Sequence, residues 1–188
     1  MRAETSVQIN EVIATRRSPR SFDSSHIMAE VDLRAGLEAA RWAPSANNGQ
    51  PWRFYAGNRG DQLFSEILSA LGEFNQMWAK NASALILVAS TVKKADGSDH
   101  AEYLFDCGLA VGQMVHELHD RGLITHQMAG YSKELARTAL AMPDDLVPVV
   151  VIAVGKQDAA EKLPEALAAR EVAPRERLPL DTLVIKGL

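Results

Sequence analysis

The sequence has little cysteine, a small charge excess and no long apolar run. Cys107 is the single cysteine among 188 residues, so the chain can form no intramolecular disulfide, and a reducing, cytoplasmic setting fits. Lys and Arg total 20 against 24 Asp and Glu, a formal net charge of −4, which excludes a general attraction to nucleic acid or anionic lipid. Any anion-binding site must therefore be local.

The longest apolar runs, 84–89 and 147–154, are far shorter than the roughly 20 residues that cross a bilayer. The polar start over 1–10 lacks the apolar stretch of a signal peptide. We therefore expect no membrane partner. The length and a hydrophobic content of 47% predict a single folded domain over 1–188.

The motifs of several enzyme classes are also missing. Gly155-Lys156 lacks the upstream glycine of a phosphate-binding loop, and no G-x-G-x-x-G follows a strand, so neither nucleotide-binding fold is predicted. No G-x-S-x-G elbow occurs, and the apolar surroundings of Cys107 favour a core thiol over a nucleophile. His116 and His119 could share a metal, but an ordinary helix end is the simpler interpretation. We expect no metal site.

Hydrophobic periodicity predicts alternating helices and strands. The first predicted helix has Ser6 as its N-terminal cap. The other predicted helices cover 29–42, 61–71, 101–119 and 132–141. The predicted strands cover 52–55, 84–90, 123–129 and 146–154. After residue 156 the pattern weakens, and 183–185 is expected to form an isolated strand that a second subunit could pair. These elements indicate a layered mixed α and β domain.

Arginine is concentrated in two segments. The residues concerned are Arg16, Arg17, Ser18 and Arg20 at a helix-to-loop junction, and Arg175 and Arg177 in the tail. Guanidinium forks match phosphate oxygens, so one phosphate could be held by Arg16, Ser18 and a tail arginine. A solvated basic turn is the alternative interpretation of the first segment.

A second polar segment lies between Pro44 and Pro51. Its hydrogen-bonding side chains are Ser45, Asn47, Asn48 and Gln50. Amide and hydroxyl groups of this kind could bind the edge of a planar, polar heterocycle. An ordinary turn is the alternative, since Asn and Gly are typical turn residues.

Taken in order, four segments resemble the flavin-dependent nitroreductase family over nearly the whole chain. Residues 16–22, R-R-S-P-R-S-F, are similar to the family's R-R-S-x-R-x-F, and residues 43–52, A-P-S-A-N-N-G-Q-P-W, to its A-P-S-x-x-N-x-Q-P-W. Residues 122–131 resemble its strand and glycine turn, and residues 175–179, R-E-R-L-P, its closing R-x-R-x-P.

This resemblance implies an α+β fold, a three-layer α/β/α sandwich, that forms an intertwined homodimer with C-terminal tail exchange. The tail over 157–188 would wrap the partner subunit, and each of two interface sites would hold one FMN. Carried over by matching position, the phosphate contacts would be Arg16, Arg17, Ser18 and Arg20 with Arg175 and Arg177, and the ring would be lined from the other subunit by Pro44, Ser45, Asn47, Asn48 and Gln50.

Further ring contacts are implied on the first subunit. Asn75 would reach the pyrimidine edge, and Ala129 and Gly130 would present backbone N–H groups to flavin N5 or O4. Some relatives carry a lysine near the ring, where this sequence offers Trp78 and Lys80. The short segment over 93–100 implies a pocket that is open or differently covered.

The implied activity is that of an FMN-dependent NAD(P)H oxidoreductase. NADPH or NADH would reduce the flavin, and nitroaromatics, quinones or similar electron-poor small molecules would accept the hydride through flavin N5 in a ping-pong sequence, with no catalytic residue required from the protein. One alternative is a specialised flavin enzyme on the same scaffold, for enone reduction, dehydrogenation or dehalogenation. Another is a flavin-storing or regulatory protein with little turnover.

Overall fold

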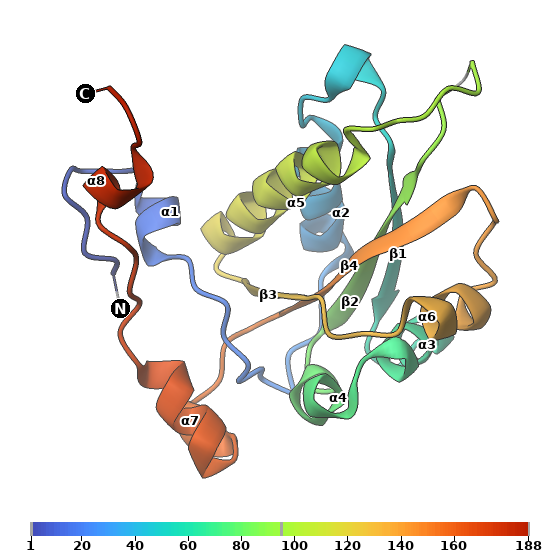
Figure 1. The fold of residues 1–188 in the computed structure, drawn as a ribbon. Coiled ribbons are helices and arrows are strands. Elements are labelled where there is room, and N and C mark those ends of the chain that lie inside the picture. The colour runs from blue at the N-terminus through green and yellow to red at the C-terminus, as the bar shows by residue number, and fades with distance from the viewer. Residues whose placement is uncertain (1, 95, 188) are drawn as a thin grey trace.

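The computed structural model describes residues 2–94 and 96–187, and its centre is a four-stranded sheet (Figure 1). The strands are β1 (Trp52–Asn58), β2 (Ala84–Thr91), β3 (Ile124–Met128) and β4 (Leu146–Gly155), in the order β1-β2-β4-β3. All three pairings are antiparallel. The two central strands, β2 and β4, are the two runs that the sequence predicts as buried strands, because helices cover both of their faces.

One face of the sheet packs on α2 (Glu30–Arg41) and α5 (Tyr103–Asp120). Alternate residues of β2, including Ile86 and Val88, point into this core together with Cys107. Cys107 is fully buried in this core, so the prediction of a core thiol is confirmed, and burial raises the pKa of its thiol.

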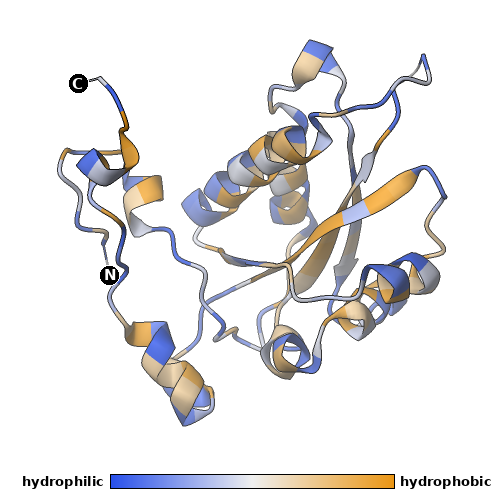
Figure 2. Ribbon diagram, in the orientation of Figure 1, coloured by the Kyte–Doolittle hydropathy of each residue, from blue (hydrophilic) through white to orange (hydrophobic). Residues whose placement is uncertain are grey.

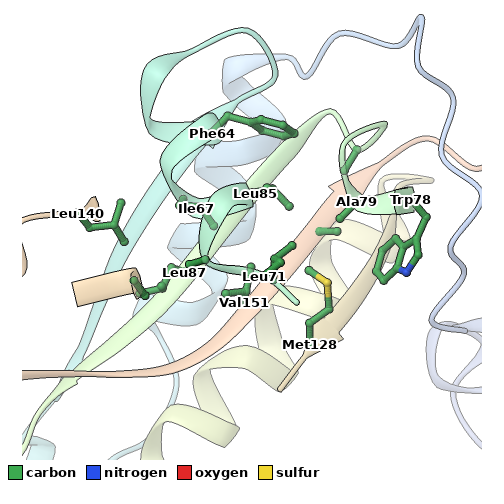
Figure 3. Packing of buried hydrophobic residues seen from close by; sticks show 14 of the residues in the cluster. Phe64, Ile67, Leu71, Trp78, Ala79, Leu85, Leu87, Met128, Leu140 and Val151 are labelled. Carbon is green, nitrogen blue, oxygen red and sulfur yellow. The ribbon is translucent and has the colours of Figure 1, made fainter. Parts of the chain in front are cut away.

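The opposite face packs on α3 (Gln62–Ala70), α4 (Glu73–Ala79) and α6 (Lys133–Ala139). Leu85, Leu87 and Val151 point into this second core, where Ile67 and Trp78 meet them (Figure 3). The two opposite faces of β2 thus line two separate cores, because successive side chains of a strand point to opposite sides of the sheet. Figure 2 shows the apolar colours running along β4 between the helical layers. The predicted three-layer sandwich is confirmed.

The first helix begins later than the sequence predicts. Helix α1 (Glu11–Thr15) is capped by Asn10, whose side chain accepts a hydrogen bond from the Val12 N–H at 2.9 Å. The predicted Ser6 cap is therefore wrong, because Asn10 is an equally good cap that lies directly before the apolar turn. The other predicted cap is confirmed, since Ser132 Oγ accepts from the Leu135 N–H at 3.2 Å.

The tail contains short helices: η2 (Ala160–Lys162), α7 (Glu165–Val172) and α8 (Leu180–Leu183). The predicted strand over 183–185 is wrong, because Leu183 closes α8 and the two residues after it pair with no strand in the described part of the chain. Pro179 caps this helix and fixes its first turn. Figure 1 shows α1, α7 and α8 together at one side of the sandwich. None of the described helices has the length and apolar character needed to span a membrane.

Candidate functional site

Arginines from the two ends of the sequence meet in the fold. The Arg175 guanidinium donates to the backbone carbonyls of Ala14 and Arg16. Arg17 Nη2 donates to the Ala173 carbonyl at 2.7 Å. These contacts fasten the tail to the segment that follows α1. The sequence segments 16–20 and 175–177 are therefore neighbours within one chain.

The cluster is strongly positive. Burial and the charge of Arg177 lower the pKa of Arg16, and burial and the nearby guanidinium of Arg16 lower the pKa of Arg175. None of Arg16, Arg20, Arg175 and Arg177 forms an ion pair with a carboxylate in residues 2–94 and 96–187. Like charges held together without such partners create a site for an anion.

Two polar groups of this cluster suit that purpose. Arg16 Nη1 donates to Ser18 Oγ at 3.1 Å, which places a hydroxyl beside a guanidinium. The Arg20 Nε atom is buried and has no hydrogen-bond partner in the described structure. An orphaned donor in a basic pocket is satisfied by an anionic oxygen.

Glu171, near the end of α7, holds the backbone of the same segment. Its carboxylate is 8% exposed and accepts the backbone N–H of Arg20 at 2.8 Å and of Ser21 at 2.9 Å. Sequence reasoning missed this residue, because a glutamate in an Ala- and Glu-rich helix gives no signal of burial. The contact forms because α7 packs against the amino-terminal segment of the same chain.

His126 of β3 connects the arginine segment to α4. His126 Nδ1 lies 3.0 Å from the Pro19 carbonyl, and its ring centroid lies 4.6 Å from that of Trp78. Burial lowers the pKa of His126. Trp78 is 1% exposed and stacks on Phe22 within the core. It lies where some relatives carry a lysine near the flavin ring, and in this structure its side chain packs in the core.

Asn75 of α4 and Gly130 after β3 lie together, as the sequence interpretation requires. Asn75 Nδ2 donates to the Gly130 carbonyl at 3.0 Å, and the Gly72 N–H donates to the same oxygen at 3.0 Å. Ala129 and Gly130 are both exposed. This group is linked through Trp78 and His126 to the arginine segment, so both lie on one side of the molecule.

The second polar segment, residues 45–50, is a tight loop that contains the short helix η1 (Ala46–Asn48). Three of its residues have positive φ, namely Asn47 (51°), Asn48 (56°) and Gln50 (45°). Ser45 Oγ accepts the Gln50 N–H at 3.0 Å, and Gln50 Nε2 donates to the Asn48 carbonyl at 2.9 Å. Four of the predicted ring-lining residues are exposed, namely Pro44, Asn47, Asn48 and Gln50, and Ser45 is partly buried.

Beneath this loop lies a buried pair that sequence reasoning also missed, His100 and Asp106, with Nε2 and Oδ2 3.0 Å apart. The available signal was a carboxylate inside the apolar pattern of α5. Beside the loop is a cavity of about 530 Å³. Its lining includes Arg53, Lys93, Lys94 and His100, so residues from both ends of the segment over 93–100 border the cavity.

The two polar regions do not meet within one chain. Near the carboxyl end of α5, His119 Nε2 lies 2.9 Å from Thr15 Oγ1, directly before the arginines. Near the amino end, Asp106 accepts the Ala46 N–H at 3.2 Å. At 1.5 Å per residue, these two contacts are about 20 Å apart along the helix. Figure 1 shows α1 beside one end of α5 and the 45–50 loop beyond the other.

Known proteins resemble this chain in sequence and in fold. A profile described as the Nitroreductase family matches residues 13–77. A relative from Archaeoglobus fulgidus named "Putative NADH dehydrogenase/NAD(P)H nitroreductase" is 30% identical over 149 residues, which cover 77% of this chain and 83% of the relative. The match therefore extends well beyond the segment that the profile covers.

Solved structures agree with these sequence matches. A crystal structure described as an oxidoreductase containing FMN is 34% identical, with a TM-score of 0.92 over 99% of this chain and 95% of that one. A "putative nitroreductase in complex with FMN" from Exiguobacterium sibiricum is 25% identical, with a TM-score of 0.77 over 98% of this chain and 100% of that one. Together with the relative of 30% identity, these likenesses establish that the chain belongs to the nitroreductase family.

Proposed function

We propose that this protein is an FMN-dependent NAD(P)H oxidoreductase that works as a homodimer. The observation that carries the proposal is the convergence of guanidinium groups from 16–20 and 175–177 with no carboxylate paired to Arg16, Arg20, Arg175 or Arg177 in the described residues. A cofactor with a terminal phosphate fits a site of this charge. The family relatives described with FMN support the same cofactor.

In this proposal the arginine cluster holds the FMN phosphate. Arg16 and Ser18 already lie 3.1 Å apart and would bind neighbouring phosphate oxygens. Arg20 would donate its orphaned Nε, while Arg175 and Arg177 add charge from the tail. Arg17 ties the tail in place through Ala173, so its contribution includes positioning the other arginines.

The flavin ring would lie between two subunits. Asn75, Ala129 and Gly130 stand on the arginine side of the same chain, and a second copy would supply Pro44, Ser45, Asn47, Asn48 and Gln50. The two regions lie about 20 Å apart along α5, which supports assigning them to different cofactor sites. In this proposal each site is completed by the partner subunit.

Helix α5 offers a surface for that partner. Leu104 and Phe105 are 57% and 70% exposed. A Cβ added at Gly108 or Gly112 would meet nothing within 4 Å, so this face is both apolar and shallow. Exposed apolar surface next to small residues permits close helix packing. The tail adds Leu183 and Ile185, which are 58% and 92% exposed, and we infer that they cover the second subunit.

When bound, FMN supplies hydride transfer through its N5, from NADH or NADPH to a nitroaromatic, a quinone or a similar acceptor in a ping-pong sequence. The chain supplies no nucleophile in this proposal. Its residues anchor the phosphate, orient the ring and shape the space above it. The open cavity of about 530 Å³ beside the 45–50 loop gives the acceptor access.

The test uses the purified protein loaded with FMN. Under anaerobic stopped-flow conditions, NADH or NADPH should bleach the flavin absorbance, and a nitroaromatic or quinone should restore it. Failure to bind FMN would overturn the proposal. Flavin that binds but is not bleached would indicate a storage or regulatory protein, and bleached flavin that only an enone or an organohalide reoxidises would indicate the specialised chemistry.

A further inference from the structure

We propose that the buried pair of His100 and Asp106 is a positioning device, which sets the conformation of the 45–50 loop and so the surface that this loop offers to the flavin of the partner subunit. The inference rests on the proposed function for the role of the loop. The contacts that hold the loop are independent of it. Neither residue touches the cofactor in this proposal.

The pair is deeply buried and directional. His100 is 3% exposed and Asp106 is 1% exposed. His100 Nε2 lies 3.0 Å from Asp106 Oδ2. Because a carboxylate accepts hydrogen bonds, His100 Nε2–H is the donor in this proposal. Asp106 lies in the first turn of α5, and the His100 N–H donates to the Val92 carbonyl at 2.9 Å. Asp106 is thus held by the helix, and His100 by a backbone hydrogen bond to the residue that follows β2.

Two contacts join the pair to the loop. Both carboxylate oxygens of Asp106 lie 3.2 Å from the Ala46 backbone nitrogen, which donates to them. On the other side, a Cβ added at Gly49 would come within 2.7 Å of His100 Cε1. The imidazole ring therefore packs against the Gly49 backbone, and the pair contacts both halves of the loop.

The loop conformation needs such support. Asn47, Asn48 and Gln50 hold the left-handed conformation, which costs free energy in residues other than glycine. The loop's own backbone bonds, from the Asn48 N–H to Ser45 and from the Gly49 N–H to Ala46, are short-range. They close the turn without fixing it to the sheet. The bond from Ala46 to Asp106 connects it to α5.

A packing role alone does not explain the residue types. A buried ionisable pair is often no more stabilising than two apolar side chains of similar size. Apolar side chains could fill this volume, but they could not accept the Ala46 N–H. The carboxylate of Asp106 is therefore explained by the hydrogen bond that it accepts from the Ala46 N–H, and the imidazole of His100 by the hydrogen bond that orients this carboxylate.

The experiment combines two readouts on the full-length protein. The first is the FMN dissociation constant of the apoprotein, measured by flavin fluorescence. The second is the hydrogen-exchange rate of the Ala46 amide, measured by NMR without FMN. The variants are Asp106→Asn, which loses the double acceptor, His100→Leu, which loses the donor, and His100→Gln, whose amide can still donate to Asp106.

We expect Asp106→Asn and His100→Leu to weaken FMN binding by about ten- to a hundredfold, the effect of losing a charge-assisted hydrogen bond, and to speed exchange at Ala46. His100→Gln should stay within about threefold of the wild type. The matched control is Glu102→Gln, an exposed carboxylate at the start of α5 with no capping bond, which should change neither readout.

Gly49→Ala keeps both buried side chains and guards against variants that fail to fold. Gly49 has a helical φ of −67°, so an added methyl strains no backbone angle. It would collide with His100 Cε1 at 2.7 Å and crowd the Ala46 carbonyl oxygen at 3.1 Å, and FMN binding should weaken. The proposal is overturned if the wild type binds FMN and the variants bind it equally well, whether or not their melting temperatures fall. If the wild type binds no FMN, the proposed function fails. An unchanged exchange rate of the Ala46 amide in Asp106→Asn would overturn the positioning role, whatever the result for FMN.

Discussion

The Glu171 carboxylate accepts the backbone N–H of Arg20 at 2.8 Å, across 151 positions of sequence. It accepts the Ser21 N–H as well. A buried carboxylate thus lies behind a cluster of arginines and accepts hydrogen bonds from the backbone of that segment. The side chains of Arg16 and Arg20 pair with no carboxylate in the described residues, so they can bind another anion.

Glu171→Gln tests this arrangement. A glutamine keeps one oxygen for the two N–H donors and replaces the other, 3.0 Å from the Arg20 nitrogen, with an NH₂ group that faces an N–H, so we expect unfolding stability to fall by about 1–3 kcal/mol. FMN affinity should fall too, by roughly tenfold, because the Arg20 segment loosens. Chemical denaturation and flavin fluorescence measure these effects. Glu161→Gln, an exposed carboxylate in η2 of the same tail, should leave both unchanged.

Arg16→Ala should weaken FMN binding by about one to two decades, since a charge-assisted contact contributes roughly 1.5–3 kcal/mol. Titration of the apoprotein with FMN checks this. Arg34→Ala, whose guanidinium lies on the exposed face of α2 and pairs with Glu30, is the control. Equal retention in both variants would remove Arg16 from the phosphate site.

Mixing two inactive variants tests whether each site spans two subunits. One variant carries Arg16→Ala, and the other carries Asn47→Ala with Asn48→Ala. If each site combines the arginines of one copy with the loop of the other, a mixed dimer contains one intact site, and random reassembly should restore about a quarter of wild-type activity. If both regions served the same chain's site, the mixture would recover nothing.

The pH dependence of folding should report His126. Burial lowers its pKa from 6.5 in the folded protein, so the unfolded chain binds more protons as the pH falls below 6.5. The contribution of His126 is fully present above that pH and is lost as the pH falls toward the folded-state pKa, at up to about 1.4 kcal/mol per pH unit. In His126→Asn, urea unfolding at pH 7 and pH 5.5 should show a smaller difference than in the wild type. His116→Asn should retain the wild-type difference.

The layers of the fold were predictable because their elements carry long apolar runs or apolar stripes at helical spacing. The runs at 84–90 and 146–154 predicted the two central strands, and the stripes at 29–42 and 101–119 predicted the helices of one face. Helix α4 was not predicted, since seven residues give too few turns for a clear stripe. The strand expected at 183–185 failed at its first residue, because Leu183 is the last residue of α8. Three apolar residues are too short a pattern to separate a strand from a helical turn.

The resemblance assigned 16–20 and 175–177 to one phosphate site and Asn75 and Gly130 to one ring site. The structure brings each pair of segments together, and the roles of these residues toward a flavin stay predictions. Glu171 and Asp106 lie outside those motifs, and each acts on the backbone of a distant segment. Contacts of that kind depend on how elements pack, which no local pattern encodes.

The length of α5 sets how far apart the two polar regions of each chain stand, and it therefore also fixes the spacing of the two cofactor positions in the proposed dimer. One residue inserted between Asp106 and His119 would rotate one end of the helix by about 100° against the other. The 45–50 loop of each copy would then turn away from its neighbour's arginines, even though every side chain of the proposed site would still be present.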